Sequence, residues 1–194
     1  MAAEFPAQPS AWVQRFAPLI APGEVLDLAC GSGRHSRLLA AMGHPVCTLD
    51  RDGAALAALA ASAPAGIATF QFDLENGTPW PFAPARFAGI VVTNYLHRPL
   101  FAAMLASLAP GGVLIYETFA RGNERYGKPS NPDFLLRQGE LLEVVRNPAM
   151  PDWRVVAFED GYVAAPKPAM VQRICAIAPG ASAQALAADF PPIF

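Results

Sequence analysis

The sequence predicts an α/β fold, a doubly wound and mostly parallel sheet of seven strands that ends in an antiparallel hairpin. Apolar runs alternate with helical patterns over most of the chain, which is typical of a parallel sheet with helices on both faces. Near the C-terminus two β-rich runs, Trp153–Val163 and Met170–Ala178, follow each other with no helical pattern between them. Two such runs pair most simply as an antiparallel hairpin.

Five apolar runs supply the parallel strands. Most of them are nearly continuous, as expected for strands that are covered on both faces. The run Ile67–Asp73 instead alternates its residue types, which indicates a strand at the sheet edge. The predicted parallel strands are Val25–Cys30, Pro45–Asp50, Ile67–Asp73, Phe87–Asn94 and Gly112–Glu117.

Helical patterns lie between these strands. The predicted helices are Arg34–Met42, Asp52–Ser62 with Asp52 as the N-cap, and Pro99–Leu108. The crossover before Phe87 contains three prolines between Pro79 and Pro84, so we expect it to be irregular. A short helical cap is expected over about residues 8–20.

The length of 194 residues fits a single domain, which we assign to residues 1–194. With 14 basic and 16 acidic side chains the net charge is −2, so a nucleic-acid partner is not favoured. The three cysteines form no C-x-x-C pair, and we expect buried reduced thiols and no metal.

The expected localisation follows from the residue patterns of the N-terminus and of the longest uncharged stretch. Residues 1–10 lack the pattern of a secretory signal, and the uncharged stretch 53–72 is broken by Pro64 and Gly66. We therefore expect a cytoplasmic protein with no membrane contact. Monomer and homodimer both stay open.

Residues 25–36 are the most informative segment. They read Val-Leu-Asp-Leu-Ala-Cys-Gly-Ser-Gly-Arg-His-Ser, an apolar strand that runs into a glycine turn and then a helix. Glycine lets a ligand approach the bare backbone, and the start of the helix attracts a negative group. This turn is therefore a candidate site for a nucleotide-like ligand.

Polar residues close the predicted strands. Asp27 lies inside the first strand, and Asp50, Asp73, Asn94 and Glu117 end the other four. Ligands of open α/β sheets bind at the carboxyl ends of the strands. Asp50 follows Gly31 by about 20 residues, the spacing of an acid that accepts both ribose hydroxyls. Asp73 is suited to accept an exocyclic amine such as that of adenine.

Together with the hairpin, these residues resemble the class I S-adenosylmethionine-dependent methyltransferases, which have a Rossmann-like fold. The phrase from Leu26 to Ser36 is also similar to a bacterial subgroup that includes tellurite-resistance-type methyltransferases. The resemblance implies S-adenosylmethionine as the cofactor. It implies cofactor contacts from Asp27, Ala29, Gly31, Gly33, Arg34, Asp50, Arg51, Asp73, Leu74 and Asn94. Ala29 stands where the family often has glycine, which costs little if its φ is negative.

Two other classes remain open. Gly31-Ser32-Gly33-Arg34-His35-Ser36 is one glycine short of the fingerprint of NAD(P)-dependent oxidoreductases. Asp73 and the final hairpin argue against that class. A non-catalytic module that binds S-adenosylmethionine is the other alternative.

The methyl acceptor is expected at the ends of the fourth and fifth strands. Tyr95 is a candidate to line its pocket, and His97 is a candidate base, with a structural role as the alternative. Glu117 precedes a long polar loop in which Arg121, Arg125 and Lys128 favour an anionic acceptor. A solvated charged loop is the alternative. Trp12 is a further substrate-binding candidate, with simple packing as its alternative. The absence of a large recognition domain from the sequence favours a small molecule.

Overall fold

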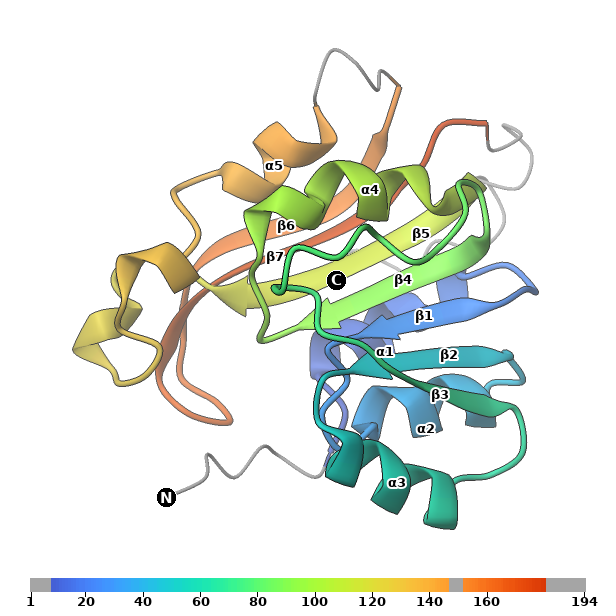
Figure 1. Ribbon diagram of the computed structural model, residues 1–194. Helices are drawn as coiled ribbons and strands as arrows, with labels where there is room; N and C mark the ends of the chain where they lie inside the picture. The colour runs from blue at the N-terminus through green and yellow to red at the C-terminus, as the bar shows by residue number, and fades with distance from the viewer. Residues whose placement is uncertain (1–7, 147–151, 181–194) are drawn as a thin grey trace.

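The computed structural model describes residues 8–146 and 152–180, where a single sheet has the strand order β3-β2-β1-β4-β5-β7-β6 (Figure 1). The strands are β1 (Val25–Leu28), β2 (Val46–Asp50), β3 (Ile67–Gln71), β4 (Phe87–Thr93), β5 (Leu108–Phe119), β6 (Arg154–Val163) and β7 (Ala169–Ile177). The first five run parallel, and β7 is antiparallel to both β5 and β6. The predicted fold class, the hairpin and the edge position of β3 are confirmed.

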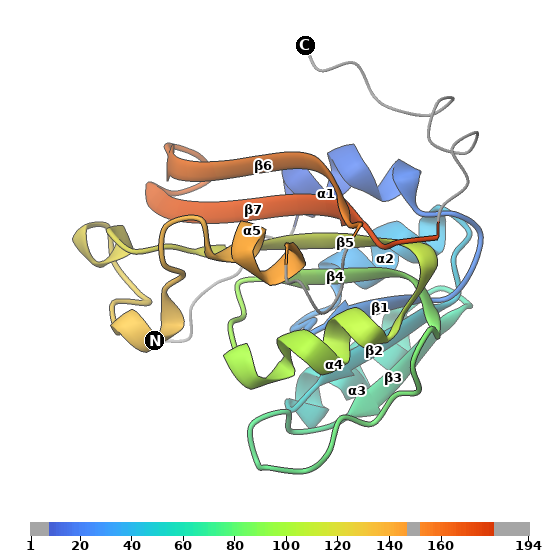
Figure 2. The same ribbon diagram turned by 90° about the horizontal axis from the view of Figure 1, so that it is seen from above.

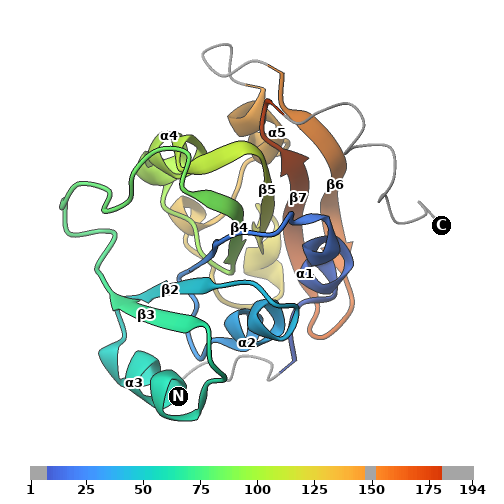
Figure 3. The same ribbon diagram turned by 90° about the vertical axis from the view of Figure 1, so that its right-hand side faces the viewer.

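Helices cover both faces of the sheet (Figures 2 and 3). The helices are α1 (Ala11–Phe16), α2 (Arg34–Ala41), α3 (Gly53–Ser62), α4 (Phe101–Ala106) and α5 (Glu140–Val145). One core cluster joins α1 and α2 to one face, and a second joins α4 and α5 to the other. The longest of these helices, α3, has 10 residues, and no helix in the described part of the chain is long and apolar enough to cross a bilayer.

The proline-rich crossover takes the place of a helix between β3 and β4. It has no regular structure, as predicted, and it covers the sheet with aromatic rings instead. The Trp80 indole donates to Ser107 Oγ at 2.7 Å, and the ring of Phe82 meets that of Phe87 edge-on at 5.1 Å. These aromatic side chains shield the apolar face of the sheet from solvent in a place where no helix covers it.

The largest differences from the sequence-based prediction concern β1, β5 and α5. Strand β1 ends at Leu28, because the next residue turns the chain, and β5 begins at Leu108 and not at Gly112. The short helix α5 was not expected, since it has six residues and its N-cap Gly139 offers no capping side chain. Short 3-10 turns at Ala17–Leu19, Arg98–Leu100, Asn123–Arg125 and Pro132–Phe134 complete the fold.

Candidate functional site

The turn after β1 holds three residues in the left-handed region of backbone space. Ala29, Gly31 and Gly33 have φ angles of 53°, 55° and 75°. A Cβ on Gly31 would meet no atom within 4 Å, so the backbone there is open to a ligand, whereas one on Gly33 would collide with Leu59 of α3. Ala29 does not meet the condition of a negative φ, and the strain of an alanine there is about 1–2 kcal/mol.

Asp50 is fixed directly beside this turn. Its Oδ2 accepts the backbone N–H of Gly31 at 2.8 Å, and its Oδ1 accepts the N–H of Asp52 at 2.9 Å. Each carboxylate oxygen has a second acceptor position, so the side chain is oriented without being saturated. The acid and the glycine turn, which the sequence relates by their spacing alone, are thus in direct contact.

Asp27 lies beneath the turn and not at its surface. Only 1% of Asp27 is exposed, and its Oδ2 accepts the Ser36 hydroxyl at 2.5 Å. The Thr48 hydroxyl in turn donates to Ser36 Oγ at 3.0 Å, which ties β1, β2 and α2 together. Burial raises the pKa of Asp27 to about 6, against the hydrogen bond from Ser36 that lowers it. The contacts of Asp27 position the start of α2.

The remaining cofactor candidates surround the same edge. Asp73 is half-buried and accepts the N–H of Glu75 at 2.9 Å, while Leu74 is buried. Arg51 is exposed beside Asp50. Arg34 is half-buried at the start of α2, where burial lowers its pKa and one of its guanidinium nitrogens lies 3.4 Å from the carbonyl oxygen of Gln8.

A cavity of about 1020 Å³ opens at the carboxyl ends of β4 and β5. These strand ends lie on the left side of Figure 1. Most of its lining comes from four places: α1 and the chain before it, the ends of these strands, the loop after β5, and the β6–β7 turn with the adjoining part of β7. Arg34 of α2 and Glu75 of the β3–β4 crossover complete it. It is lined by Gln8, Pro9, Ser10, Ala11, Gln14, Arg34, Glu75, Asn94, Tyr95, Leu96, Glu117, Thr118, Phe119, Asn123, Tyr126, Lys128, Pro129, Ser130, Asn131, Phe134, Val163, Ala165, Pro166, Lys167, Pro168, Ala169, Val171 and Arg173.

Asn94 and Tyr95 enter this cavity from the end of β4. Asn94 is exposed with a φ of 56°, a conformation that asparagine tolerates better than most residues. The Tyr95 hydroxyl is buried, has no partner at hydrogen-bond distance in the described part of the chain, and interacts more weakly with the Glu75 carboxylate. Burial and the nearby Glu75 charge raise the pKa of Tyr95, so the phenol keeps its proton. A donor at a cavity wall with no partner at hydrogen-bond distance is suited to orient a ligand.

His97 is not among the residues that line the cavity, whereas Ser10, which lines it, is bonded to His35. The Ser10 N–H donates to Nε2 of His35 at 3.1 Å, and Nδ1 lies 3.4 Å from Thr93 Oγ1. Because a backbone N–H only donates, Nε2 must be the acceptor and the proton sits on Nδ1. Burial, aided by the Arg34 charge, lowers the pKa of His35 to about 3. His35 is therefore a neutral anchor.

Glu117 closes one wall of the cavity through two charged or polar contacts. Its Oε1 accepts the Ser10 hydroxyl at 2.9 Å, and its Oε2 lies 3.1 Å from Arg173. Arg173 also pairs with Glu159 at 2.6 Å and lies over the Trp12 ring at 4.8 Å. The charge of Glu117 is thus compensated before any ligand arrives.

Trp12 lies in the core, in contrast to its prediction as a substrate-binding residue. It is 3% exposed, and its indole N–H donates to the Ile174 carbonyl at 3.2 Å. The ring packs edge-on against Phe16 at 4.6 Å. This burial favours the packing alternative, in which the ring holds α1 against β7.

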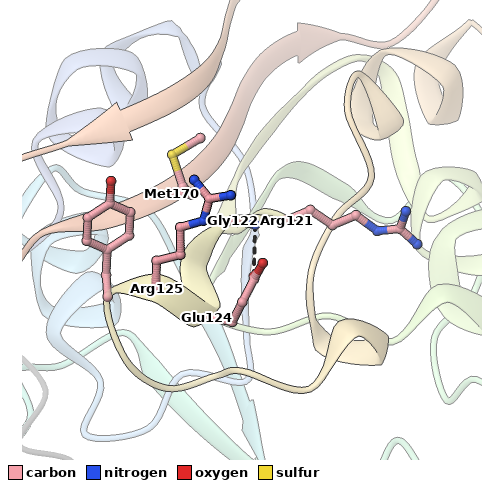
Figure 4. A pocket seen from close by; sticks show the side chains of 6 residues that line it. Arg121, Gly122, Glu124, Arg125 and Met170 are labelled. Carbon is pink, nitrogen blue, oxygen red and sulfur yellow. Dashed lines mark hydrogen bonds between the residues drawn. The ribbon is translucent and has the colours of Figure 1, made fainter.

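Arg121 and Arg125 do not line the large cavity. With Gly122, Glu124, Tyr126 and Met170 they surround a separate pocket of about 370 Å³ (Figure 4). Arg125 extends toward Met170, and Arg121 extends away from it on the other side of the loop (Figure 4). The two arginines that were expected to favour an anionic acceptor therefore lie outside the lining of the large cavity. The cation of this loop that does line the cavity is Lys128.

An ion pair that the sequence did not reveal fastens the loop after β5. Arg98 donates through Nε and Nη2 to the two oxygens of Glu140 at 2.6 and 3.0 Å, and to the carbonyls of Asp133 and Leu135 at 2.7 and 2.9 Å. Burial alone would raise the pKa of Glu140, but the bonds from Arg98 and from the Arg137 N–H hold it below its ordinary value. The partners are 42 positions apart in the sequence, so no local pattern signals this pair.

Known proteins resemble this chain in sequence and in fold. A family model described as a methyltransferase domain matches residues 25–112. The trans-aconitate 2-methyltransferase of Methylobacterium nodulans is 36% identical over 111 residues, which are 55% of this chain and 42% of that protein. The chain thus aligns with less than half of that relative.

Two solved structures show the shared fold. TehB from Haemophilus influenzae superposes with a TM-score of 0.70 at 20% identity, over 86% of this chain and 61% of that one. An S-adenosylmethionine-dependent methyltransferase from Mesorhizobium loti superposes with a TM-score of 0.65 at 17% identity, over 82% and 93% of the two chains. The common feature is the mostly parallel sheet with its final antiparallel strands.

Proposed function

We propose that this chain, which is a class I S-adenosylmethionine-dependent methyltransferase, transfers a methyl group to a small-molecule acceptor held in the cavity beside β4 and β5. The observation that carries the proposal is the contact between Asp50 and Gly31, in the turn that leads into Arg34, a residue of the cavity lining. It joins the acid at the end of β2 to the open glycine turn, which are the two features that an adenosine with a charged amino-acid tail requires.

S-adenosylmethionine fits the residues around this turn. The open space over Gly31 admits a ligand that contacts the backbone, and Asp50 keeps free acceptor positions for the ribose hydroxyls. Asp73 and Leu74 are assigned to adenine. Gly33, Arg34 and Asn94 are assigned to the methionine part together with Ala29, and Arg51 to the ribose side.

The sulfonium supplies an activated methyl group when the cofactor is bound. The protein then has to hold the acceptor in line and exclude water, and such positioning can supply about 7–11 kcal/mol of the barrier. The Tyr95 hydroxyl, buried and with no partner at hydrogen-bond distance among the described residues, is assigned to the orientation of the acceptor. His97 is not assigned a role as base, because it is absent from the cavity lining.

A small-molecule acceptor is supported by the enclosure of the cavity. Its walls come from several segments of the chain, and its volume of about 1020 Å³ suits a compact ligand beside the cofactor tail. The curated relative is named for a small acid, trans-aconitate. Neither feature identifies the acceptor atom.

The two alternatives have different weights. Dinucleotide-binding sheets of the Rossmann type are parallel with order 3-2-1-4-5-6, so the antiparallel β7 between β5 and β6 counts against an NAD(P)-dependent oxidoreductase. A non-catalytic module that binds S-adenosylmethionine would have the same sheet and the same turn. Only an activity measurement distinguishes it from a methyltransferase.

One experiment tests the proposal in two stages. Calorimetric titration with S-adenosylhomocysteine and with NAD should show binding of the first and none of the second. Incubation with methyl-labelled S-adenosylmethionine and a panel of small acids and phenols should then yield labelled product. Binding of NAD in place of S-adenosylhomocysteine would overturn the assignment, and binding with no turnover across the panel would favour the non-catalytic module.

A further inference from the structure

The far end of the cavity from the glycine turn carries two cations from different segments. Lys128 lies in the loop after β5, and Lys167 lies in the β6–β7 turn. Both are exposed, and neither has a hydrogen bond or ion pair with another residue of the described chain. By contrast, Arg173 and Glu117 of the same cavity neutralise each other.

The loop that carries Lys128 is fastened to the hairpin. Asn123 is 1% exposed, donates to the Pro129 carbonyl at 3.0 Å and accepts the Met170 N–H at 3.2 Å. The rings of Tyr126 and Tyr162 lie 5.2 Å apart and join the same two segments. These contacts hold the loop of Lys128 next to the strands that Lys167 connects.

Apolar side chains occupy much of the wall between the two ends of the cavity. Phe134 is 49% exposed and Tyr126 46% exposed, although both are large and line the cavity. Leu96, Phe119 and Val171 add further apolar lining. Exposed apolar surface inside a cavity indicates that a ligand with an apolar body covers it.

We infer that the acceptor is an amphipathic organic anion, with its apolar body against Phe134 and Tyr126 and its anionic group between Lys128 and Lys167. That the ligand is a methyl acceptor rests on the proposed function. Its chemical class, an amphipathic anion, rests on the lining of the cavity alone. The sole uncompensated anion of the described lining, Glu75, lies at the opposite end near Tyr95. The charge pattern therefore orients the ligand with its reacting end toward the ends of the strands.

The test uses two fluorescent probes of similar shape. The anion 1-anilinonaphthalene-8-sulfonate is titrated against the full chain in the presence of S-adenosylhomocysteine, next to the neutral N-phenyl-1-naphthylamine. Replacing both lysines, Lys128→Gln with Lys167→Gln, should weaken binding of the anion about three- to tenfold, since each exposed charge contact is worth little. Binding of the neutral probe should stay unchanged.

The matched control is Arg125→Gln combined with Arg121→Gln. It removes the same amount of charge, all of it from the loop after β5 and outside the large cavity, so affinity for the anion should be retained. An equal loss in the control, or an unchanged affinity in the lysine variant, would overturn the inference. Displacement of the anionic probe by 1-naphthoate and by naphthyl phosphate distinguishes a carboxylate from a phosphate ligand, and displacement by neutral 1-naphthamide as effectively as by the anions would also overturn it.

Failure of this inference and failure of the proposed function give different results. Calorimetry with S-adenosylhomocysteine reports on the cofactor edge, and both lysine residues lie outside the residues assigned to it. A chain that binds the anionic probe through the two lysines but not S-adenosylhomocysteine would keep the anion site and lose the methyltransferase proposal.

Discussion

The backbone N–H of Ser10 donates to Nε2 of His35 across 3.1 Å, and through this bond the chain before α1 is held over the start of α2. The hydroxyl of the same serine donates to Glu117 and also accepts the Trp12 N–H as the N-cap of α1. One residue thus connects the N-terminal segment, the cavity wall and α2. The connection requires a neutral imidazole, because a protonated ring would point Nε2–H at another donor.

The first prediction concerns this imidazole and pH. His35 binds a proton near pH 6.5 when unfolded and near pH 3 in the fold. Between these values the unfolded state holds more protons, so stability is complete above about pH 6.5 and falls as the pH is lowered, by at most about 1.4 kcal/mol per unit. His35→Gln keeps an acceptor for Ser10 but does not titrate. Urea unfolding of both proteins from pH 7.5 to 4.5 should show the wild type losing stability relative to the variant.

A difference between the two that is constant over this range would contradict the assignment of a neutral His35. The quantity compared is the difference in unfolding free energy between the wild type and His35→Gln at each pH. The contributions of carboxylates that titrate in both proteins cancel in this difference.

Asp27 should act in the opposite direction. Its pKa is about 6 in the fold and 3.8 in the unfolded chain, so between these values the folded state holds more protons. Lowering the pH through 6 therefore stabilises the wild type, while Asp27→Asn, which still accepts the Ser36 hydroxyl, lacks this gain. The stability of the variant relative to the wild type should be highest at pH 7 and lower at pH 4 by about 2–3 kcal/mol. Guanidinium titrations at the two pH values measure this, and an opposite slope would refute it.

Ala29 offers a prediction on backbone strain. Because its φ is 53°, Ala29→Gly should stabilise the protein by about 1 kcal/mol. Ala57→Gly, at an exposed position inside α3, should instead destabilise it by about 1 kcal/mol. Thermal unfolding of the three proteins compares them directly. If both glycine variants lose stability alike, the turn does not hold the strain assigned to it.

The sequence predicts the sheet well because its signals are local. Continuous apolar runs mark the strands β1, β2, β4 and β5, alternation marks the edge strand β3, and prolines mark the irregular crossover. The glycine turn and Asp50 were also predictable, since the spacing of about 20 residues follows from one strand–helix–strand unit.

Side-chain directions in loops were not predictable in this way. Arg121 and Lys128 lie in one polar loop, yet only the lysine lines the large cavity, and the loop path that decides this depends on Asn123 and its bond to β7. His35 follows the glycine turn, and His97 follows the end of β4. Tertiary packing, and not a local sequence pattern, decides that the N-terminal segment contacts His35.

Asp50 provides the direct test of cofactor recognition. Asp50→Ala should weaken binding of S-adenosylhomocysteine by about 1–3 kcal/mol, because the ribose hydroxyls lose a charged acceptor and Gly31 loses the bond that orients the turn. The neighbouring Asp52 accepts the N–H groups of Ala54 and Ala55 as the cap of α3. Asp52→Ala is therefore the matched control, with about 1 kcal/mol lost in stability and little in affinity. Calorimetry on folded variants separates the two, and equal affinity of Asp50→Ala and the wild type would remove the ribose assignment.

Arg98 should control the loop that forms the acceptor side of the cavity. Its partner Glu140 is 3% exposed, so Arg98→Gln leaves a buried carboxylate with one strong donor fewer and should destabilise the protein by about 2–3 kcal/mol. Arg137→Gln removes a more exposed and more distant guanidinium, 3.4 Å from the same carboxylate, and should cost less than about 1 kcal/mol. Because Arg98 also holds the carbonyls of Asp133 and Leu135, its loss should speed proteolysis within residues 121–139 while binding of S-adenosylhomocysteine is kept. Equal proteolysis rates in the two variants would show that the loop is held by other contacts than this ion pair.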